Sequence, residues 1–169
     1  MTSHTPPTLA KGRPILFLDG DSAIHAQAIR RFNDAEWTVI VMRHLSLGEP
    51  SDEATLQAAL RELQAEASAH GAHIDGVYVC PPTVGTDRAP VITRFQQALD
   101  AQERVPTNCV AVGDKLAHLE PARRIGCRTV LVETGYGIAL AASPQELPFR
   151  PDVILPDLEA VADWALKSG

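Results

Sequence analysis

A short apolar segment that ends in two acids constrains the fold of this 169-residue chain more than any other feature. The apolar residues 15–18 run directly into Asp19, Gly20 and Asp21. An apolar run of this length followed by turn residues is typical of a buried parallel strand. Open α/β sheets bind ligands at the carboxyl ends of such strands. The alternative interpretation is that residues 19–21 form only a polar turn and a helix cap.

Strand-like apolar runs alternate with helix-like segments along the rest of the chain. We expect five further strands, at residues 37–42, 76–80, 109–112, 129–132 and 153–155. We expect helices at residues 22–33, 51–71, 91–102, 116–125 and 158–166, and a loop at 136–151. This alternation predicts an α/β fold of three layers, a doubly wound parallel sheet with helices on both faces.

The second of these helices has the clearest amphipathic pattern. Ser51 is the expected N-cap, since serine accepts hydrogen bonds from the first free backbone amides of a helix. Leu56, Leu60 and Leu63 follow helical spacing, so we expect them in the core.

Composition limits the classes of partner. The net charge is −6, which argues against a nucleic-acid-binding surface and against attraction to anionic lipid. No apolar run is long enough to span a membrane. The three cysteines show no pairing pattern, which favours a reducing, cytoplasmic setting. We expect residues 1–12 to be a flexible tail and residues 13–169 to be one domain, as a monomer or homodimer.

A second predicted strand also ends in an acid, at Asp114. In a doubly wound sheet the ends of two such strands can meet at one edge, which would bring Asp19, Asp21 and Asp114 together. Converging carboxylates repel one another unless a cation lies between them, and hard oxygen ligands suit Mg²⁺. The backbone amides of residues 20–23 would point toward an anion at a helix start. An aspartate beside Mg²⁺ and a phosphate could act as a nucleophile.

Two motifs then resemble those of the haloacid dehalogenase (HAD) superfamily: Asp19-Gly20-Asp21 after a hydrophobic strand, and residues 112–115, Val-Gly-Asp-Lys. Residues 15–166 resemble most the small, cap-less phosphatases of heptose bisphosphate and histidinol phosphate. The resemblance implies a HAD-like Rossmannoid fold without a cap domain. It also implies that Asp19 is the nucleophile and a Mg²⁺ ligand, that Asp21 is the general acid/base and gives its carbonyl to the metal, and that Asp114 is the third ligand.

The chain departs from the family pattern at several positions. Met42 lies where the family places a phosphate-binding Thr or Ser, and Ala89 lies where it places a lysine. His118 replaces the second acid of the last motif, and only Cys80 remains of the zinc-binding loop. The Gly-Thr that follows the first acids is replaced by residues 22–23, Ser-Ala.

Three cations could compensate for the missing lysine, because arginine and lysine both bind phosphate. They are Arg43, Arg88 and Lys115, and with Gly20 and Ser22 they make up the predicted phosphate site. The resulting hypothesis is a Mg²⁺-dependent HAD phosphatase that acts through an aspartyl-phosphate on a small sugar phosphate or similar metabolite.

Two alternatives remain open. Because of the lost motif residues, the chain could be a catalytically inactive HAD-fold protein that binds a phosphorylated ligand or a protein partner. A receiver domain like those of response regulators fits less well, because the acids are placed differently.

Overall fold

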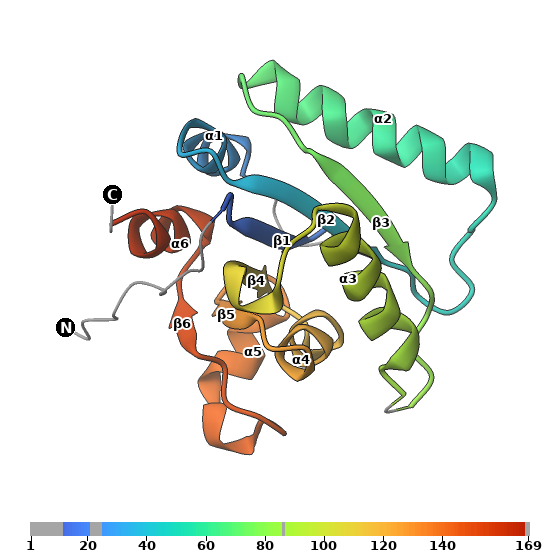
Figure 1. Ribbon diagram of the computed structural model, residues 1–169. Coiled ribbons are helices and arrows are strands. Elements are labelled where there is room, and N and C mark those ends of the chain that lie inside the picture. The colour runs from blue at the N-terminus through green and yellow to red at the C-terminus, as the bar shows by residue number, and fades with distance from the viewer. Residues whose placement is uncertain (1–11, 21–24, 86, 168–169) are drawn as a thin grey trace.

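The computed structural model describes residues 12–20, 25–85 and 87–167. Six parallel strands form one sheet in the order β3-β2-β1-β4-β5-β6 (Figure 1). The strands are β1 (Ile15–Asp19), β2 (Thr38–His44), β3 (Gly76–Cys80), β4 (Cys109–Gly113), β5 (Arg128–Val132) and β6 (Val153–Leu155). The α-helices are α1 (Ala26–Asp34), α2 (Glu53–Ala69), α3 (Ala89–Ala101), α4 (Leu116–Arg124), α5 (Gly137–Ala142) and α6 (Leu158–Ala165). The predicted doubly wound α/β fold is confirmed.

The strand that ends in the two acids is central in the sheet. β1 pairs with β2 on one side and β4 on the other, with Leu18 opposite both Val41 and Val112. All five residues of β1 are buried, as expected of a strand covered on both faces. The chain passes from β1 to β2 in one direction, and β4 lies on the other side. This is the switch point at which open α/β sheets bind ligands.

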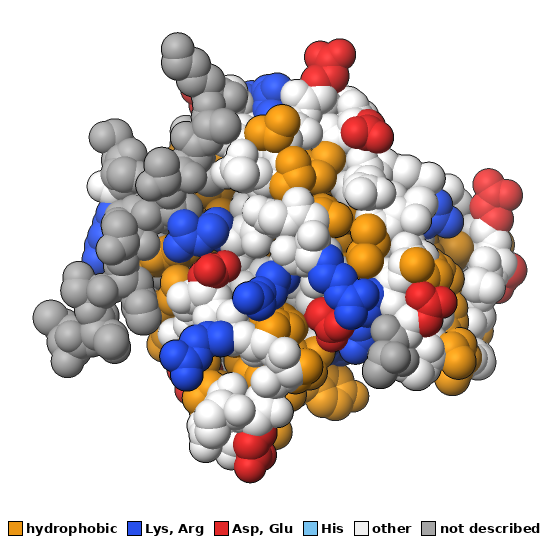
Figure 2. Space-filling model, turned by 60° about the horizontal axis from the view of Figure 1, so that its bottom comes forward, with side chains coloured by type: hydrophobic (Ala, Val, Ile, Leu, Met, Phe, Trp, Pro, Cys, Tyr) orange, Lys and Arg blue, Asp and Glu red, His pale blue; other side chains and the backbone are white. Residues whose placement is uncertain are grey.

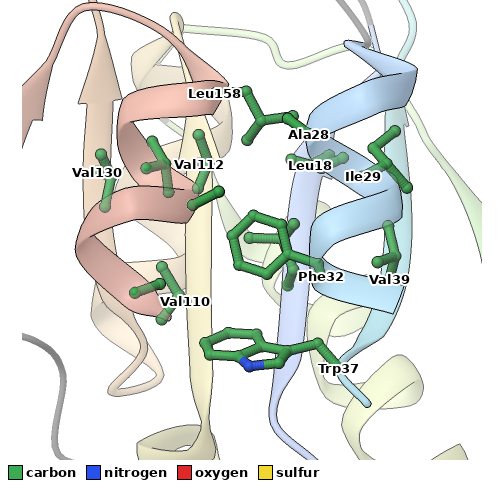
Figure 3. Close-up of a cluster of buried hydrophobic side chains, with 14 of the residues drawn as sticks. Leu18, Ala28, Ile29, Phe32, Trp37, Val39, Val110, Val112, Val130 and Leu158 are labelled. Atoms are coloured by element: carbon green, nitrogen blue, oxygen red, sulfur yellow. The ribbon is translucent and has the colours of Figure 1, made fainter. Parts of the chain in front are cut away.

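Each face of the sheet carries its own hydrophobic cluster. α1, α2 and α6 lie on one face, and α3 and α4 lie on the other (Figure 1). On the first face, Phe32 of α1 meets Trp37 edge to face, with ring centroids 5.1 Å apart, in a cluster that also contains Val110 and Leu158 (Figure 3). Residues alternate between the two clusters along β1, since successive side chains of a strand point to opposite faces.

Three predictions about local structure were wrong. Asp52, not Ser51, is the N-cap of α2, and its carboxylate accepts a hydrogen bond from the Thr55 amide at 3.1 Å. The predicted loop 136–151 contains α5 and a short 3₁₀ helix, Pro144–Glu146, because a six-residue helix is too short to show helical periodicity.

The third correction concerns the face of α2. Leu56, Leu60 and Leu63 are only partly buried, and Ala67 is the one residue of α2 that is fully buried. The three leucines border a cavity of about 530 Å³ between α2 and strand β3, and of the three only Leu63 also packs against the hydrophobic cluster on this face. Amphipathic spacing therefore identified the inward face of α2 but not how closely it packs.

The face of the molecule shown in Figure 2 carries a mixture of charged and hydrophobic side chains. On the face shown in Figure 2, basic side chains lie beside acidic and hydrophobic ones and form no unbroken basic surface. Within the described residues, no helix has both the length and the apolar character needed to cross a bilayer.

The cluster around Phe32 should dominate the stability of the first face. We expect Phe32→Ala to lower the free energy of unfolding by about 3–5 kcal/mol, because it leaves a cavity beside Trp37. Val105→Ala, at an exposed apolar residue, should change it by less than about 0.5 kcal/mol. Urea unfolding of both variants measures this difference, and equal midpoints would contradict the described packing.

Candidate active site

Asp19 lies at the carboxyl end of β1 and is almost fully buried. Strand alternation puts its side chain on the face that also receives Ile15 and Phe17. The next residue continues the pairing with β2, since the Gly20 amide donates to the Met42 carbonyl at 3.0 Å. Asp19 is therefore held rigidly at the switch point.

Asp114 directly follows β4 and is also buried, at 3% exposure. The glycine before it allows the two acids to approach. A Cβ at Gly113 would lie 3.1 Å from Cβ of Asp19 and 2.8 Å from Cδ2 of His118. Both contacts are closer than packed side chains tolerate, so the gap between β1 and β4 requires a residue without a side chain.

The charges of Asp19 and Asp114 interact. Burial raises the pKa of Asp114, and the negative charge of Asp19 raises it further. The Tyr136 amide and the Lys115 ammonium oppose these effects and lower the pKa of Asp114. Of the three acids predicted to converge, Asp19 and Asp114 therefore lie close together.

One oxygen of Asp114 is anchored and the other is available for a ligand. Oδ2 accepts a hydrogen bond from the Tyr136 amide at 3.1 Å. Oδ1 is buried, and the described residues provide no hydrogen-bond partner for it. A buried carboxylate oxygen in this state is costly unless something binds it.

Two glycines shape the loop that anchors Asp114. Gly135 has a positive φ of 52°, and a Cβ there would collide with Oδ2 of Asp114. A Cβ at Gly137 would collide with the Val132 carbonyl. Glycine at both positions therefore lets the loop come close enough for the Tyr136 amide to reach Asp114.

These features fit Mg²⁺, which prefers hard carboxylate oxygens and keeps water and substrate in its shell. Asp19 and Asp114 would supply two such ligands. The third predicted acid, Asp21, lies outside the described residues, as does Ser22. Within the residues that are described, no group of three or more His, Cys, Asp or Glu side chains is arranged to hold a metal ion. A complete site would therefore require Asp21.

Two buried histidines, His44 and His118, lie near the carboxylates, since Cδ2 of His118 is close to Gly113. Nε2 of His118 is 3.3 Å from the Phe17 carbonyl, which can only accept, so this nitrogen carries the proton. Burial lowers the pKa of His118 to about 4, so the ring is neutral and its Nδ1 accepts. His44 then donates from Nε2 across 2.8 Å to that Nδ1. Burial, together with the neighbouring His118, also lowers the pKa of His44, so both rings are neutral at pH 7.

Gly20 and Arg43 lie together, but in the cavity of about 530 Å³ under α2. The Arg43 guanidinium pairs with Glu49, with Nη2 and Oε1 2.6 Å apart. Strand alternation places Arg43 on the face of the sheet opposite Asp19. This larger cavity is thus separate from the face that receives the Asp19 side chain.

Arg88 precedes α3 and pairs with Glu120 of α4, with Nε and Oε2 3.5 Å apart. Both side chains are largely buried, and Glu120 also pairs with Arg124 at 2.7 Å. The guanidinium of Arg88 therefore links two helices. Its positive charge still reaches the site, because it contributes to the lowered pKa of His44.

Lys115 is the predicted cation that shares a cavity with the surroundings of Asp114. This second cavity, of about 430 Å³, is lined by His44, Leu45, Ser46, Leu47, Thr83, Lys115, Ala117 and Tyr136. The Lys115 ammonium lies over the Tyr136 ring, 5.6 Å from its centroid. Lys115 is the next residue after Asp114, and the Tyr136 amide donates a hydrogen bond to Asp114. Because both residues line this cavity, we take it as the mouth of the candidate active site.

Sequence reasoning did not find Tyr136, Gly135 or the hydrogen bond between the two histidines. The only local signal for the first two was their glycine-rich context after a strand. The histidines come from β2 and α4, 74 positions apart, so no sequence spacing could pair them.

Comparison with known proteins agrees with this geometry. A HAD-hydrolase-like family model matches residues 87–161. A D-glycero-D-manno-heptose-1,7-bisphosphate 7-phosphatase of Thermosynechococcus vestitus is 32% identical in an alignment 189 residues long, gaps included. The alignment covers 90% of this chain and 95% of the relative. The chain belongs to the HAD superfamily. It joins a group of phosphatases, which are hydrolases, as the two motifs indicated.

Further relatives support this membership. A D-glycero-beta-D-manno-heptose-1,7-bisphosphate 7-phosphatase of Pseudomonas aeruginosa is 35% identical, over 83% of this chain and 80% of the relative. The crystal structure of a D,D-heptose 1,7-bisphosphate phosphatase of B. bronchiseptica, complexed with magnesium and phosphate, matches with a TM-score of 0.80 and 26% identity. That match covers 92% of this chain and 99% of the other, so the fold is that of a HAD phosphatase without a cap domain.

Gly135 should be required for the site and not only for the turn. Gly135→Ala and Gly85→Ala both place a side chain at positive φ, but only the first new Cβ would collide with Asp114. We expect both to cost about 1 kcal/mol of stability, and only Gly135→Ala to lose phosphatase activity and Mg²⁺ binding. Thermal unfolding with and without Mg²⁺ separates the two variants. Equal responses to Mg²⁺ would show that the close approach to Asp114 is unimportant.

Repulsion between the two acids should be measurable without substrate. In the presence of a chelator we expect Asp114→Asn to raise the melting temperature by about 2–4 °C, equivalent to about 1 kcal/mol, since the amide removes a charge beside Asp19. The control is Asp100→Asn at an exposed residue of α3. This substitution should leave the melting temperature unchanged. A lower melting temperature for Asp114→Asn would contradict the repulsion.

Proposed function

We propose that this chain is a Mg²⁺-dependent phosphomonoesterase in which the Asp19 carboxylate is the nucleophile. The observation that carries the proposal is the buried pair of Asp19 and Asp114 at the switch point, with an Asp114 oxygen that lacks a hydrogen bond from the described residues. Buried like charges are retained at sites whose function depends on them.

The reaction follows from these roles. An oxygen of Asp19 attacks phosphorus and forms an aspartyl-phosphate, while the bond from phosphorus to the alcohol oxygen breaks. Asp21, in the role that the family resemblance gives it, protonates the leaving alkoxide. It then takes a proton from the water that attacks phosphorus, so that orthophosphate leaves and the Asp19 carboxylate is restored. Mg²⁺ held by Asp19, Asp21 and Asp114 would neutralise the charge that builds up on the phosphoryl oxygens.

Lys115 is the best candidate to stand in for the lysine that Ala89 replaces. It lines the mouth and lowers the pKa of Asp114. Arg43 and Arg88 carry the same charge, but each has a glutamate partner that partly neutralises it. The position of the family hydroxyl is held by Met42, which is fully buried in a hydrophobic cluster, so we assign it no contact with phosphate.

The substrate that we propose is a phosphate ester of a small metabolite. The named relatives act on a sugar bisphosphate, and the mouth of about 430 Å³ falls in the range of about 300–1,000 Å³ typical of small-molecule sites. A binding role without catalysis would fit the loss of the hydroxyl and lysine, yet the relatives are named phosphatases and give it no support. Mutation of Asp19 distinguishes the two.

Asp19→Asn should abolish turnover and leave the fold intact, because the amide matches the carboxylate in shape but cannot act as the nucleophile. We expect hydrolysis of p-nitrophenyl phosphate with Mg²⁺ to fall by about 10⁴-fold or more, and Asp100→Asn to retain wild-type rates. Chelation should abolish the activity of the wild type, and Mg²⁺ should restore it. If wild type and Asp19→Asn both match a buffer blank, the chain has a binding role only.

A further inference from the structure

Exposed hydrophobic side chains lie in the segments at the carboxyl edge of the sheet, and two of them line the mouth of the candidate site. Among the described residues, five large hydrophobic side chains are more than half exposed, and four of them follow the carboxyl ends of strands: Leu47 after β2, Val84 after β3, and Tyr136 and Ile138 after β5. The fifth, Val105, precedes β4 at the opposite edge of the sheet. We call the four residues Leu47, Val84, Tyr136 and Ile138 the apolar rim.

The apolar rim is continuous with the site. Leu47 and Tyr136 line the cavity of about 430 Å³ together with Lys115. Val84 directly follows Thr83, which also lines it, and Ile138 lies in the first turn of α5. The Tyr136 amide binds Asp114, so apolar surface begins next to the carboxylates and extends outward.

Exposed apolar groups gathered at one place mark a binding site more often than they occur by chance. Leu47 and Tyr136 are 73% and 69% exposed, so a ligand could bury most of either side chain. The polar groups that could bind sugar hydroxyls are few. Besides Lys115, the polar side chains that line the cavity are those of Ser46, Thr83 and His44. Nε2 of His44 already donates to His118, which leaves its Nδ1 as a single acceptor.

We propose that the substrate is a phosphomonoester of an aromatic or other apolar alcohol, whose apolar part binds against Leu47 and Tyr136. This inference rests on the proposed phosphatase function and names the substrate class of the same site. The phosphate lies at the Asp19 and Asp114 end of the mouth, and the alcohol leaves along the apolar rim. The size of the cavity fits one small molecule, and the Tyr136 ring offers an aromatic group a surface on which to stack.

The test compares two esters of primary alcohols, benzyl phosphate and glucose 6-phosphate, so that leaving-group chemistry is similar and polarity differs. With Mg²⁺ we expect kcat/KM of the wild type to be at least about tenfold higher for benzyl phosphate. Leu47→Ser should raise KM for benzyl phosphate by about five- to tenfold with little change in kcat, since it removes apolar contact made equally before and during reaction. Tyr136→Ser should raise KM by a similar factor, but its kcat is not diagnostic because the Tyr136 ring also lies under the Lys115 ammonium. Val105→Ser is the matched control and should match the wild type.

Two results would overturn the inference while the proposed function stands: a preference for glucose 6-phosphate, or rim variants that behave like Val105→Ser. If the apolar rim instead binds a second copy of the chain or another protein, Leu47→Ser should change the sedimentation behaviour and leave the kinetics unchanged. That result would also overturn the inference.

If the wild type hydrolyses neither ester, the proposed function fails, and binding still decides the inference. Calorimetry should then show benzylphosphonate binding at least about tenfold more tightly than methylphosphonate, with the difference lost in Leu47→Ser. Equal binding of the two phosphonates would reject the apolar rim as a ligand site.

Discussion

The site depends on the repulsion between two carboxylates that the fold holds together in a buried place. Asp19 and Asp114 end adjacent parallel strands, and Gly113 removes the side chain that would separate them. Hydrophobic clusters on both faces of the sheet fix β1 and β4, so the acids cannot move apart without disturbing the core. Packing therefore maintains an arrangement that electrostatics opposes, and a cation between the acids would relieve it.

The surroundings of this pair are less positive than the family pattern implies. Two neutral histidines, His44 and His118, and the fully buried Met42 lie on the same face of the sheet as Asp19. Lys115 and the Tyr136 amide are the groups that lower the pKa of Asp114. Both groups lie in the segments that follow β4 and β5 at the carboxyl edge of the sheet. The same edge carries the apolar rim, which links the electrostatics of the site to the choice of substrate.

Sequence patterns predicted the elements well where burial is complete and poorly where it is partial. All six strands were found, because a strand covered on both faces reads as a continuous apolar run. α5 was missed because six residues are too few to show a period. In α2 the spacing of Leu56, Leu60 and Leu63 identified a face but could not tell a filled core from the border of a cavity.

The sequence by itself determined the doubly wound fold and the pair of Asp19 and Asp114, since strand ends in a parallel sheet meet at one edge whatever the packing. Only the tertiary structure placed the three candidate cations relative to that pair. Arg43, Arg88 and Lys115 were equivalent in sequence, but the first pairs with Glu49 on the other face and the second with Glu120 between helices. Lys115 alone of these three lines the mouth. The reach of a long side chain depends on contacts between elements far apart in the chain, which no local pattern encodes.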